Sequence, residues 1–224
     1  DISILNKLGF IPIIIHGGGK RISNKLNEVG IKNNFINGLR VTDKNSINIV
    51  EDVLINFNKE IIESLKKNLC ESQSITSKEN NILIVEQENK ELGFVGTPIE
   101  INLSIIDQIV RDKKVPVIAP LGLDENHQVY NINADTVAGS IAKKLNARRL
   151  IIISDVEGVL DDNKKLISEI NTGEVNNLIK CGTINGGMIP KIKNCLDVAN
   201  NGVKGVCIID GRLEHSILFE LLSN

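Results

Sequence analysis

The chain has 224 residues, of which 42% are hydrophobic and 24% charged, and its formal net charge is −2 at pH 7. A near-neutral chain without a long basic run, with 3% aromatic residues and no tryptophan, does not favour a nucleic acid as its main partner. No apolar run reaches the roughly 20 residues of a membrane helix, so we expect no membrane segment. The composition is typical of a globular chain that can bury a sizeable core.

Near the amino end, a glycine loop lies between a predicted strand and a predicted helix. Residues 11–15 form a buried strand, His16 to Lys20 read HGGGK, and helical spacing continues to about Val29. Glycines let a ligand approach the backbone, and a helix amino end offers N–H groups to an anion. The spacing is neither GxGxxG nor that of a P-loop, so a ligand loop and a plain turn remain equal alternatives.

A long amphipathic helix is predicted after a turn that carries one arginine, Arg40. Thr42 and Asp43 are typical helix caps, and apolar residues recur at three- and four-residue steps from Ile47 to Leu69. Such a stripe packs either on the chain's own sheet or against a second subunit. Beyond it, residues 73–81 are polar and predict a surface loop.

Residues 130–160 combine a polar turn, an apolar helix and a buried strand. Asn131 and Asn133 lie in the turn, and Asp135 falls in the first helical turn. Residues 150–153 are a continuous apolar run, typical of a strand covered on both faces. Loops at the carboxyl ends of such strands commonly bind ligands. Asp135 has a plainer alternative, as a favourable charge at a helix amino end.

A second glycine loop, Gly182–Gly187, precedes a helix that we expect to start at Pro190. Lys191 then lies in the first helical turn, where the helix dipole disfavours a cation, and this local conflict points to function. A lysine extended into water is the alternative. A last strand is predicted at 203–209. Strands and helices alternate throughout, so the expected fold is α/β with a mainly parallel sheet. No HExxH or similar ligand cluster is present, and we expect no metal site built from side chains.

Several segments occur in the order and spacing of one known family. These are HGGG at His16–Gly19, NGLRVTD at Asn37–Asp43, NINAD at Asn131–Asp135, SDVEGVL at Ser154–Leu160, GGMIPK at Gly186–Lys191 and IIDGR at Ile208–Arg212. Together they resemble the acetylglutamate kinases of the amino acid kinase family over nearly the whole chain. The resemblance implies a three-layer α/β/α fold of the carbamate kinase-like type. It also implies a single domain over 1–224, with an amino-acid-binding and dimerisation lobe (1–146) and a nucleotide-binding lobe (147–224).

The activity that the resemblance implies is transfer of a phosphoryl group from ATP, with Mg²⁺, to the side-chain carboxylate of N-acetyl-L-glutamate in arginine biosynthesis. Such chemistry asks a protein mainly for positioning and positive charge. For the acyl amino acid, the implied residues are Gly18, Gly19, Arg40, Asn131 and Asn133. Arg40 would hold the α-carboxylate, and Gly18 would border the transferred phosphate. Lys191 would stabilise charge on that phosphate, and Asp135 would organise the catalytic lysines. The implied nucleotide site is lined by Asp155, Val156, Glu157, Gly158, Val159, Leu160, Thr183, Ile184 and Asn185.

Two departures from the family pattern shape further expectations. Family members carry a strand, a lysine and paired glycines upstream of the point where this chain begins, so we expect residues 1–224 alone not to turn over. Residues 74–80 read SITSKEN, where the family usually has glycines. The alternatives are a kinase of a related acid such as N-acetyl-aminoadipate, and a catalytically dead regulatory homologue.

The resemblance also bears on partners and location. It implies a homodimer or a hexamer, and a signalling partner of the PII type. The abundance of isoleucine, asparagine and lysine is typical of an AT-rich genome, such as that of a plastid or a reduced bacterium. We therefore expect the cytoplasm or the plastid stroma.

Overall fold

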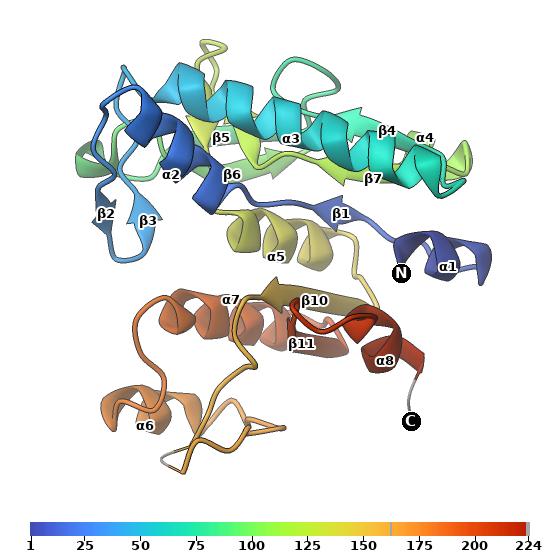
Figure 1. The fold of residues 1–224 in the computed structure, drawn as a ribbon, viewed down its shortest axis with the longest axis vertical. Coiled ribbons are helices and arrows are strands. Elements are labelled where there is room, and N and C mark those ends of the chain that lie inside the picture. The colour runs from blue at the N-terminus through green and yellow to red at the C-terminus, as the bar shows by residue number, and fades with distance from the viewer. Residues whose placement is uncertain (162, 223–224) are drawn as a thin grey trace. The chain divides into compact units, whose positions relative to one another are not determined.

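The computed structural model describes residues 1–161 and 163–222, and the chain divides into two compact units. One unit is Ile2–Val137, and the other is Ala138–Asn224 together with Asp1. The first contains α1 (Ile2–Lys7), β1 (Ile14–Ile15), α2 (Gly19–Glu28), β2 (Phe35–Ile36), β3 (Leu39–Arg40), α3 (Ile47–Lys67), β4 (Ser72–Ile75), β5 (Leu83–Gln87), η1 (Lys90–Leu92), β6 (Gly96–Ile101), α4 (Leu103–Arg111), β7 (Val115–Ile118), β8 (Leu121–Leu123) and β9 (Val129–Asn131) (Figure 1). The helix α5 (Ala134–Lys144) crosses the boundary, and β10 (Arg149–Ser154), α6 (Val175–Lys180), α7 (Met188–Asn200), β11 (Gly205–Asp210) and α8 (Ser216–Leu222) follow.

Three parallel strands in the order β1-β7-β4 form the sheet that positions the first part of the site. All four residues of the central strand β7 are buried, as expected for a strand with a neighbour on each side. This confirms the predicted parallel sheet. The predicted strand over 11–15 is shorter than expected, because only Ile14 and Ile15 pair with β7 and Ile11 is 65% exposed.

A second sheet in the same unit was not expected from the sequence. Its order is β6-β5-β8-β9, and it is mixed: β5 pairs antiparallel with β6 and parallel with β8, and β8 pairs antiparallel with β9. Residues 121–128, for which no strand is predicted, include the strand β8. Short strands of three residues carry little periodicity, so the sequence pattern does not predict them.

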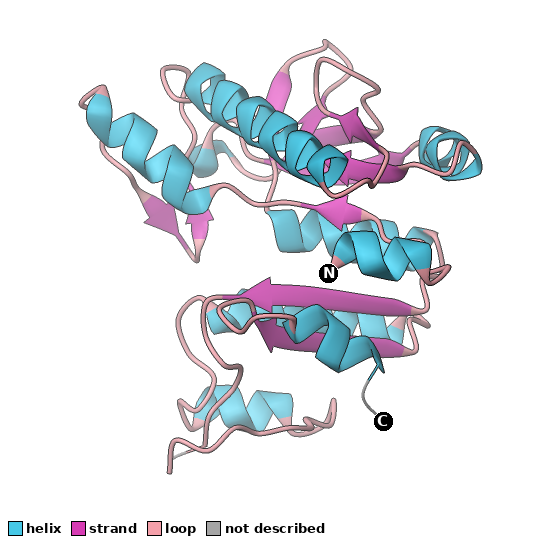
Figure 2. Ribbon diagram, turned by 45° about the vertical axis from the view of Figure 1, so that its right-hand side comes forward, coloured by secondary structure: helices cyan, strands magenta, loops and turns pink. Residues whose placement is uncertain are grey.

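The long helix α3 contacts β4, β7 and β9 and lies along one face of the parallel strands (Figures 1 and 2). Its apolar stripe is buried at Ile47, Val50, Leu54 and Leu65, whereas the predicted last member, Leu69, lies beyond the helix and is 83% exposed. Before it, the Asp43 carboxylate accepts the backbone N–H of Ser46 at 2.9 Å, so the predicted cap forms. A hydrogen bond from the Ser46 hydroxyl holds the pKa of Asp43 below its usual range. None of the helices among the described residues is long and apolar enough to cross a membrane.

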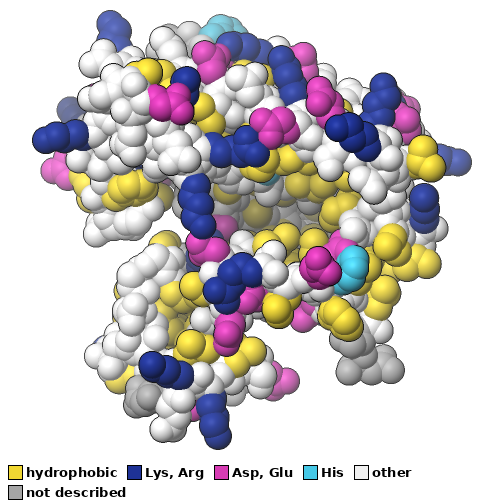
Figure 3. Space-filling view, viewed as in Figure 1, with side chains coloured by type: hydrophobic (Ala, Val, Ile, Leu, Met, Phe, Trp, Pro, Cys, Tyr) yellow, Lys and Arg dark blue, Asp and Glu magenta, His cyan; other side chains and the backbone are white. Residues whose placement is uncertain are grey.

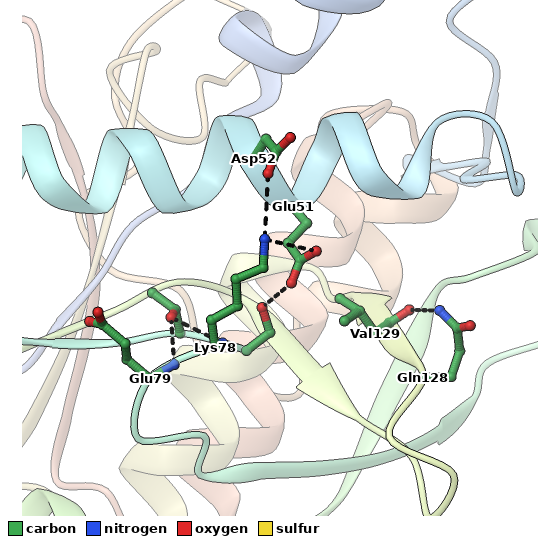
Figure 4. A network of polar contacts seen from close by, with 8 residues as sticks. Glu51, Asp52, Lys78, Glu79, Gln128 and Val129 are labelled. Carbon is green, nitrogen blue, oxygen red and sulfur yellow. Dashed lines mark hydrogen bonds and ion pairs between the residues drawn. The ribbon is translucent and has the colours of Figure 1, made fainter.

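The prediction of a surface loop over residues 73–81 is wrong in part. The strand β4 occupies its beginning, and Ser77 is buried beside α3. The Ser77 hydroxyl donates to the buried Glu51 carboxylate at 2.5 Å, and Lys78 Nζ lies 3.6 Å from Glu51 and from Asp52 (Figure 4). Polar residues can be buried where they satisfy one another, so polarity alone does not predict exposure here.

In the unit Ala138–Asn224, the strands β10 and β11 pair in parallel over six residues, from Arg149 opposite Gly205 to Ser154 opposite Asp210. This confirms the predicted strands over 150–153 and 203–209, although β11 begins at Gly205. The prediction that residues 150–153 are covered on both faces is wrong, because Leu150 and Ile152 are buried while Ile153 is 52% exposed. The core beside these strands holds residues from α5, β10 and α7, among them Ala142, Leu150, Ile152, Val198 and Val203. The carboxyl ends of both strands meet at one edge, where α/β proteins place ligands.

Candidate active site

The first part of the site is the glycine loop between β1 and α2. Gly18 is the residue before α2, and its carbonyl accepts the N–H of Ile22 at 2.8 Å as the helix begins. Within residues 1–161 and 163–222, no acceptor receives the backbone N–H of Gly17 or Gly18. N–H groups that are left open at the start of a helix suit an anionic ligand.

A side chain at position 18 and one at position 19 would meet different surroundings. A Cβ on Gly18 would lie 2.7 Å from Cδ2 of Leu54, so glycine lets the loop pack closely on α3. A Cβ on Gly19 would have nothing within 4 Å. The protein itself therefore leaves the space beside Gly19 open.

This difference gives a paired prediction. Gly18→Ala is expected to lower the free energy of unfolding by about 1–3 kcal/mol, because the added methyl overpacks the contact with Leu54. Gly19→Ala should leave stability unchanged or slightly higher, because alanine favours a helix over glycine. If a ligand lies beside Gly19, the same variant should weaken binding of N-acetylglutamate by about tenfold or more. Thermal unfolding and calorimetric titration measure both effects, and an unchanged affinity in Gly19→Ala would remove Gly19 from the ligand site.

Arg40 is a buried cation beside this loop, with 7% of its surface exposed. Its Nη2 donates to the Gly19 carbonyl and to the Ser23 hydroxyl, both at 2.9 Å, and its Nη1 donates to the side-chain oxygen of Asn33. The guanidinium also lies 4.7 Å from the ring centroid of Phe35. No carboxylate in the described part of the chain pairs with it, and burial lowers its pKa. A buried guanidinium that donates only to neutral oxygens favours an anionic ligand.

Asn131 is connected to Arg40 through one buried residue. Its side-chain Nδ2 donates to the Thr42 hydroxyl at 3.2 Å, and that hydroxyl donates to the Arg40 carbonyl at 3.2 Å. Thr42 has no exposed surface, so this link is internal. The structure therefore brings together Gly19, Arg40 and Asn131, which the sequence places far apart.

Asn133 and Asp135 lie at the amino end of α5, which approaches the glycine loop. A Cβ on Gly17 would lie 3.9 Å from Cβ of Ala134. The Asn133 side-chain oxygen accepts the N–H of Thr136 at 3.1 Å, so this asparagine caps the helix. Asp135 is in the first turn, as predicted. Capping is a local reason for asparagine at position 133 and competes with its expected role in substrate binding.

A separate group of predicted ligand residues lies in the unit Ala138–Asn224, in the loop that leaves β10. Asp155, Val156 and Glu157 are exposed there, whereas Val159 is buried. Val159 shares a hydrophobic cluster with Ile184 of the second glycine loop and with α7. The two predicted nucleotide loops are therefore joined through their apolar side chains. Ile184, whose side chain is 1% exposed, can offer only backbone groups to a ligand.

Lys191 lies in α7, which starts at Met188 rather than at the predicted Pro190. Proline is compatible with any position of the first turn, because the N–H groups there have no helical partner. Lys191 is thus the fourth helical residue and partly exposed. The prediction of a lysine close to a helix amino end holds, although the helix start was placed two residues too late.

A cavity of about 1030 Å³ in the same unit meets only part of the predicted nucleotide site. Glu157, Gly158 and Val159 line it, whereas Thr183, Ile184, Asn185 and Lys191 are not among its lining residues. Of the nine residues predicted for the nucleotide, three therefore line this cavity and the other six do not.

Sequence reasoning gave no role to Asp210, which ends β11 at the same edge of the sheet. Its carboxylate accepts Arg212 Nε at 2.9 Å and Nη2 at 2.7 Å, a bidentate pair that lowers the pKa of Asp210 and raises that of Arg212. The charges of Glu157 and Asp155 act on Arg212 in the same direction. The sequence did contain a signal for Asp210, because the IIDGR segment lies at the end of a predicted strand, where α/β proteins commonly bind ligands.

Charge is distributed without a dominant basic field. On the face that Figure 3 shows, lysine and arginine side chains are interspersed with acidic ones. Throughout the described ranges, no group of three or more His, Cys, Asp and Glu side chains is arranged to hold a metal ion. A divalent ion at this site would therefore need ligands from a bound molecule, as Mg²⁺ commonly takes from phosphates.

Several known proteins are similar to this chain in sequence or in fold. Residues 1–210 match the amino acid kinase family. The acetylglutamate kinase of Pelagibacter ubique is 68% identical over 224 residues, which is 100% of this chain and 78% of that protein. That of Caldanaerobacter subterraneus is 42% identical over 230 residues, covering 100% of this chain and 77% of that protein. The crystal structure of smu.665 from Streptococcus mutans is 31% identical with a TM-score of 0.89, covering 93% of this chain and 86% of that one.

Proposed function

The chain belongs to the amino acid kinase family, and we propose that it acts as an acetylglutamate kinase. It transfers the terminal phosphoryl group of ATP to the side-chain carboxylate of N-acetyl-L-glutamate, giving N-acetyl-glutamyl 5-phosphate for arginine biosynthesis. The observation that carries the substrate class is Arg40, a buried cation with only neutral partners, beside a glycine loop with open N–H groups. The 68% identical acetylglutamate kinase supports the same activity.

Different residues bind the acceptor and the nucleotide. Arg40 binds the α-carboxylate with its guanidinium N–H groups, Asn131 also contacts it, and the glycine loop holds the rest of the acyl amino acid. The loop after β10 and residues 183–185 bind the nucleotide through backbone groups. Lys191 stabilises charge that develops on the phosphoryl oxygens, and Asp135 orients the catalytic lysines.

Magnesium is proposed to arrive with ATP and to be held by the nucleotide phosphates, which neutralises their charge. The side chains described do not form a metal site of their own. Every protein contribution above therefore comes from residues that bind or orient the two substrates.

Assembly and location belong to the same proposal. A homodimer or hexamer and a partner of the PII type follow from the resemblance, and light scattering after size exclusion tests the first. The bacterial relatives favour a bacterial cytoplasm over a plastid stroma.

The activity is tested by ADP release and by trapping the acyl phosphate as a hydroxamate. In a protein extended upstream by the strand, lysine and paired glycines of the family, we expect both signals with N-acetyl-L-glutamate and ATP, and neither with unacetylated glutamate. N-acetyl-aminoadipate, one methylene longer, serves as the discriminating substrate, because one methylene in a pocket is worth about 1–3 kcal/mol. A higher kcat/KM for the longer acid would replace the proposed substrate, and no hydroxamate with either acid would overturn the kinase assignment.

A further inference from the structure

One buried hydrogen-bond chain connects α3 to the glycine loop, and the function proposed above does not use it. Asn58, which has no exposed surface, donates through Nδ2 to the Val117 carbonyl of β7 at 2.9 Å. The same Nδ2 lies 3.2 Å from Nε2 of His16, whose ring is buried with 6% exposure. The other ring nitrogen, Nδ1, lies 3.0 Å from the Gly17 carbonyl.

These contacts fix which ring nitrogen carries the proton. A carbonyl oxygen cannot donate, so the bond to Gly17 requires a proton on Nδ1 of His16. The Asn58 amide donates to Nε2, which therefore must be the acceptor. Both hydrogens of the Asn58 amide are then used, one on Val117 and one on His16. A flipped Asn58 amide would place its oxygen against the Val117 carbonyl, which is unfavourable.

The ring is also held by packing. The Phe57 ring packs edge-on against the His16 ring, with 5.1 Å between the two ring centroids and an interplanar angle of 79°. The Arg21 guanidinium carbon lies 4.0 Å from the centroid of the Phe57 ring. Burial lowers the pKa of His16, and the Arg21 charge acts in the same direction, whereas the bond to Gly17 opposes them. A neutral imidazole is the form that this chain of hydrogen bonds needs.

The hydrogen bond between His16 and the Gly17 carbonyl affects the candidate site through the Gly17–Gly18 peptide unit. The Gly17 carbonyl and the Gly18 N–H belong to the same peptide bond, and no cis peptide is present among the described residues. In a trans peptide these two groups point in opposite directions. Fixing the carbonyl on His16 therefore directs the Gly18 N–H away from the ring, and that N–H has no acceptor in the described protein.

We propose that His16, held by Asn58, is a positioning residue that orients the Gly17–Gly18 peptide so that the Gly18 N–H donates to the bound anionic substrate. This deepens the proposed function and rests on it. His16 itself touches neither substrate. Its effect should thus appear in the chemical step, where a fixed donor matters most, rather than in nucleotide binding.

Two substitutions separate this role from simple packing. In asparagine, the side-chain nitrogen is two bonds from Cβ, as Nδ1 is in histidine, so His16→Asn can keep the donor to Gly17. In glutamine the polar atoms are three bonds from Cβ, as Nε2 is, so His16→Gln can keep only the contact with Asn58. Both leave a smaller or more flexible group against Phe57. We expect similar losses of thermal stability in both variants. We expect kcat within about threefold of the unaltered protein in His16→Asn, and at least about tenfold lower in His16→Gln with the KM for ATP unchanged.

Phe57→Leu is the control for packing, because it removes the ring contact and leaves the hydrogen bonds. It should lower stability without a comparable fall in kcat. Equal kcat values in His16→Asn and His16→Gln, or a fall in Phe57→Leu as large as in His16→Gln, would overturn the positioning role.

A readout without turnover distinguishes failure of this inference from failure of the proposed function. Nitrogen-15 NMR of the unaltered protein should show His16 protonated on Nδ1 alone. N-acetylglutamate should shift the Gly18 amide resonance in the unaltered protein and in His16→Asn more than in His16→Gln. A proton on Nε2, or equal Gly18 shifts in the two variants, would refute the inference. Lack of any N-acetylglutamate phosphorylation by the upstream-extended protein without substitutions would instead refute the function.

Discussion

In a protein that also carries the family's upstream strand, lysine and glycines, replacing Lys191 by methionine is expected to lower kcat for N-acetylglutamate phosphorylation by about 100- to 1000-fold, the typical cost of losing one preorganised group that stabilises transition-state charge. The KM values for both substrates should stay within about twofold, because the lysine acts on charge that develops only as the phosphoryl group moves. Methionine keeps the length and the apolar stem, so α7 should fold unchanged. Steady-state kinetics and thermal unfolding measure the two effects.

Lys193 provides the matched control on the same helix. It is exposed, and two residues along an α-helix turn the side chain by about 200°, to the opposite side. Lys193→Met should leave kcat unchanged within about twofold. If Lys191→Met raised KM for ATP and left kcat intact, Lys191 would belong to nucleotide binding rather than to the chemical step.

The sequence predicted those elements whose signal is local. The apolar run at 150–153 and the stripe from Ile47 to Leu65 became β10 and α3, because a buried strand and an amphipathic helix each carry their own periodicity. The cap at Asp43 was also readable, since a side chain that accepts N–H groups three residues on needs no distant partner.

The elements that were missed depend on distant partners. Residues 73–81 look like a solvated loop until Glu51 of α3 is placed against Ser77, 26 residues away. The strand β8 is three residues long and is defined by its pairing with β5 and β9 rather than by its composition. Pairing of this kind is a property of the folded chain, and no window of sequence contains it.

In the candidate site, too, some features could be predicted from local sequence and others depend on the folded chain. The motifs identified Gly18, Gly19 and Arg40, but only the structure shows that Gly18 packs on Leu54 while Gly19 faces open space. Likewise, the motif includes Ile184 among nucleotide residues, yet its side chain is 1% exposed and belongs to the core. A motif names positions, whereas packing decides whether the side chain or the backbone meets the ligand.

Arg40→Ala is expected to raise the KM for N-acetylglutamate by roughly 30- to 150-fold and to change the KM for ATP little. This rise in KM corresponds to the loss of charged hydrogen bonds worth about 2–3 kcal/mol. The structural reason is that Arg40 is buried, bonded only to neutral oxygens and placed between the glycine loop and Asn131. Calorimetric titration of N-acetylglutamate gives the same comparison without turnover.

Arg40 also supports the fold, so its structural and binding roles must be separated. Its removal takes away packing on Phe35 and the bonds to Gly19 and Ser23, and some loss of stability is expected in any Arg40 variant. Ser23→Ala removes one of those bonds and keeps the cation, so it should lower stability slightly and leave the KM for N-acetylglutamate within about threefold.

Arg40→Lys completes the comparison, because lysine keeps the charge and loses the planar fork that grips a carboxylate with two bonds. Its KM for N-acetylglutamate should lie between those of the unaltered protein and Arg40→Ala, with ATP again little affected. A purely structural role predicts a different order: the KM values for both substrates would rise together and would follow the loss of thermal stability across all three variants. That result would remove Arg40 from the amino acid site, and with it the observation that identifies the substrate as a carboxylate.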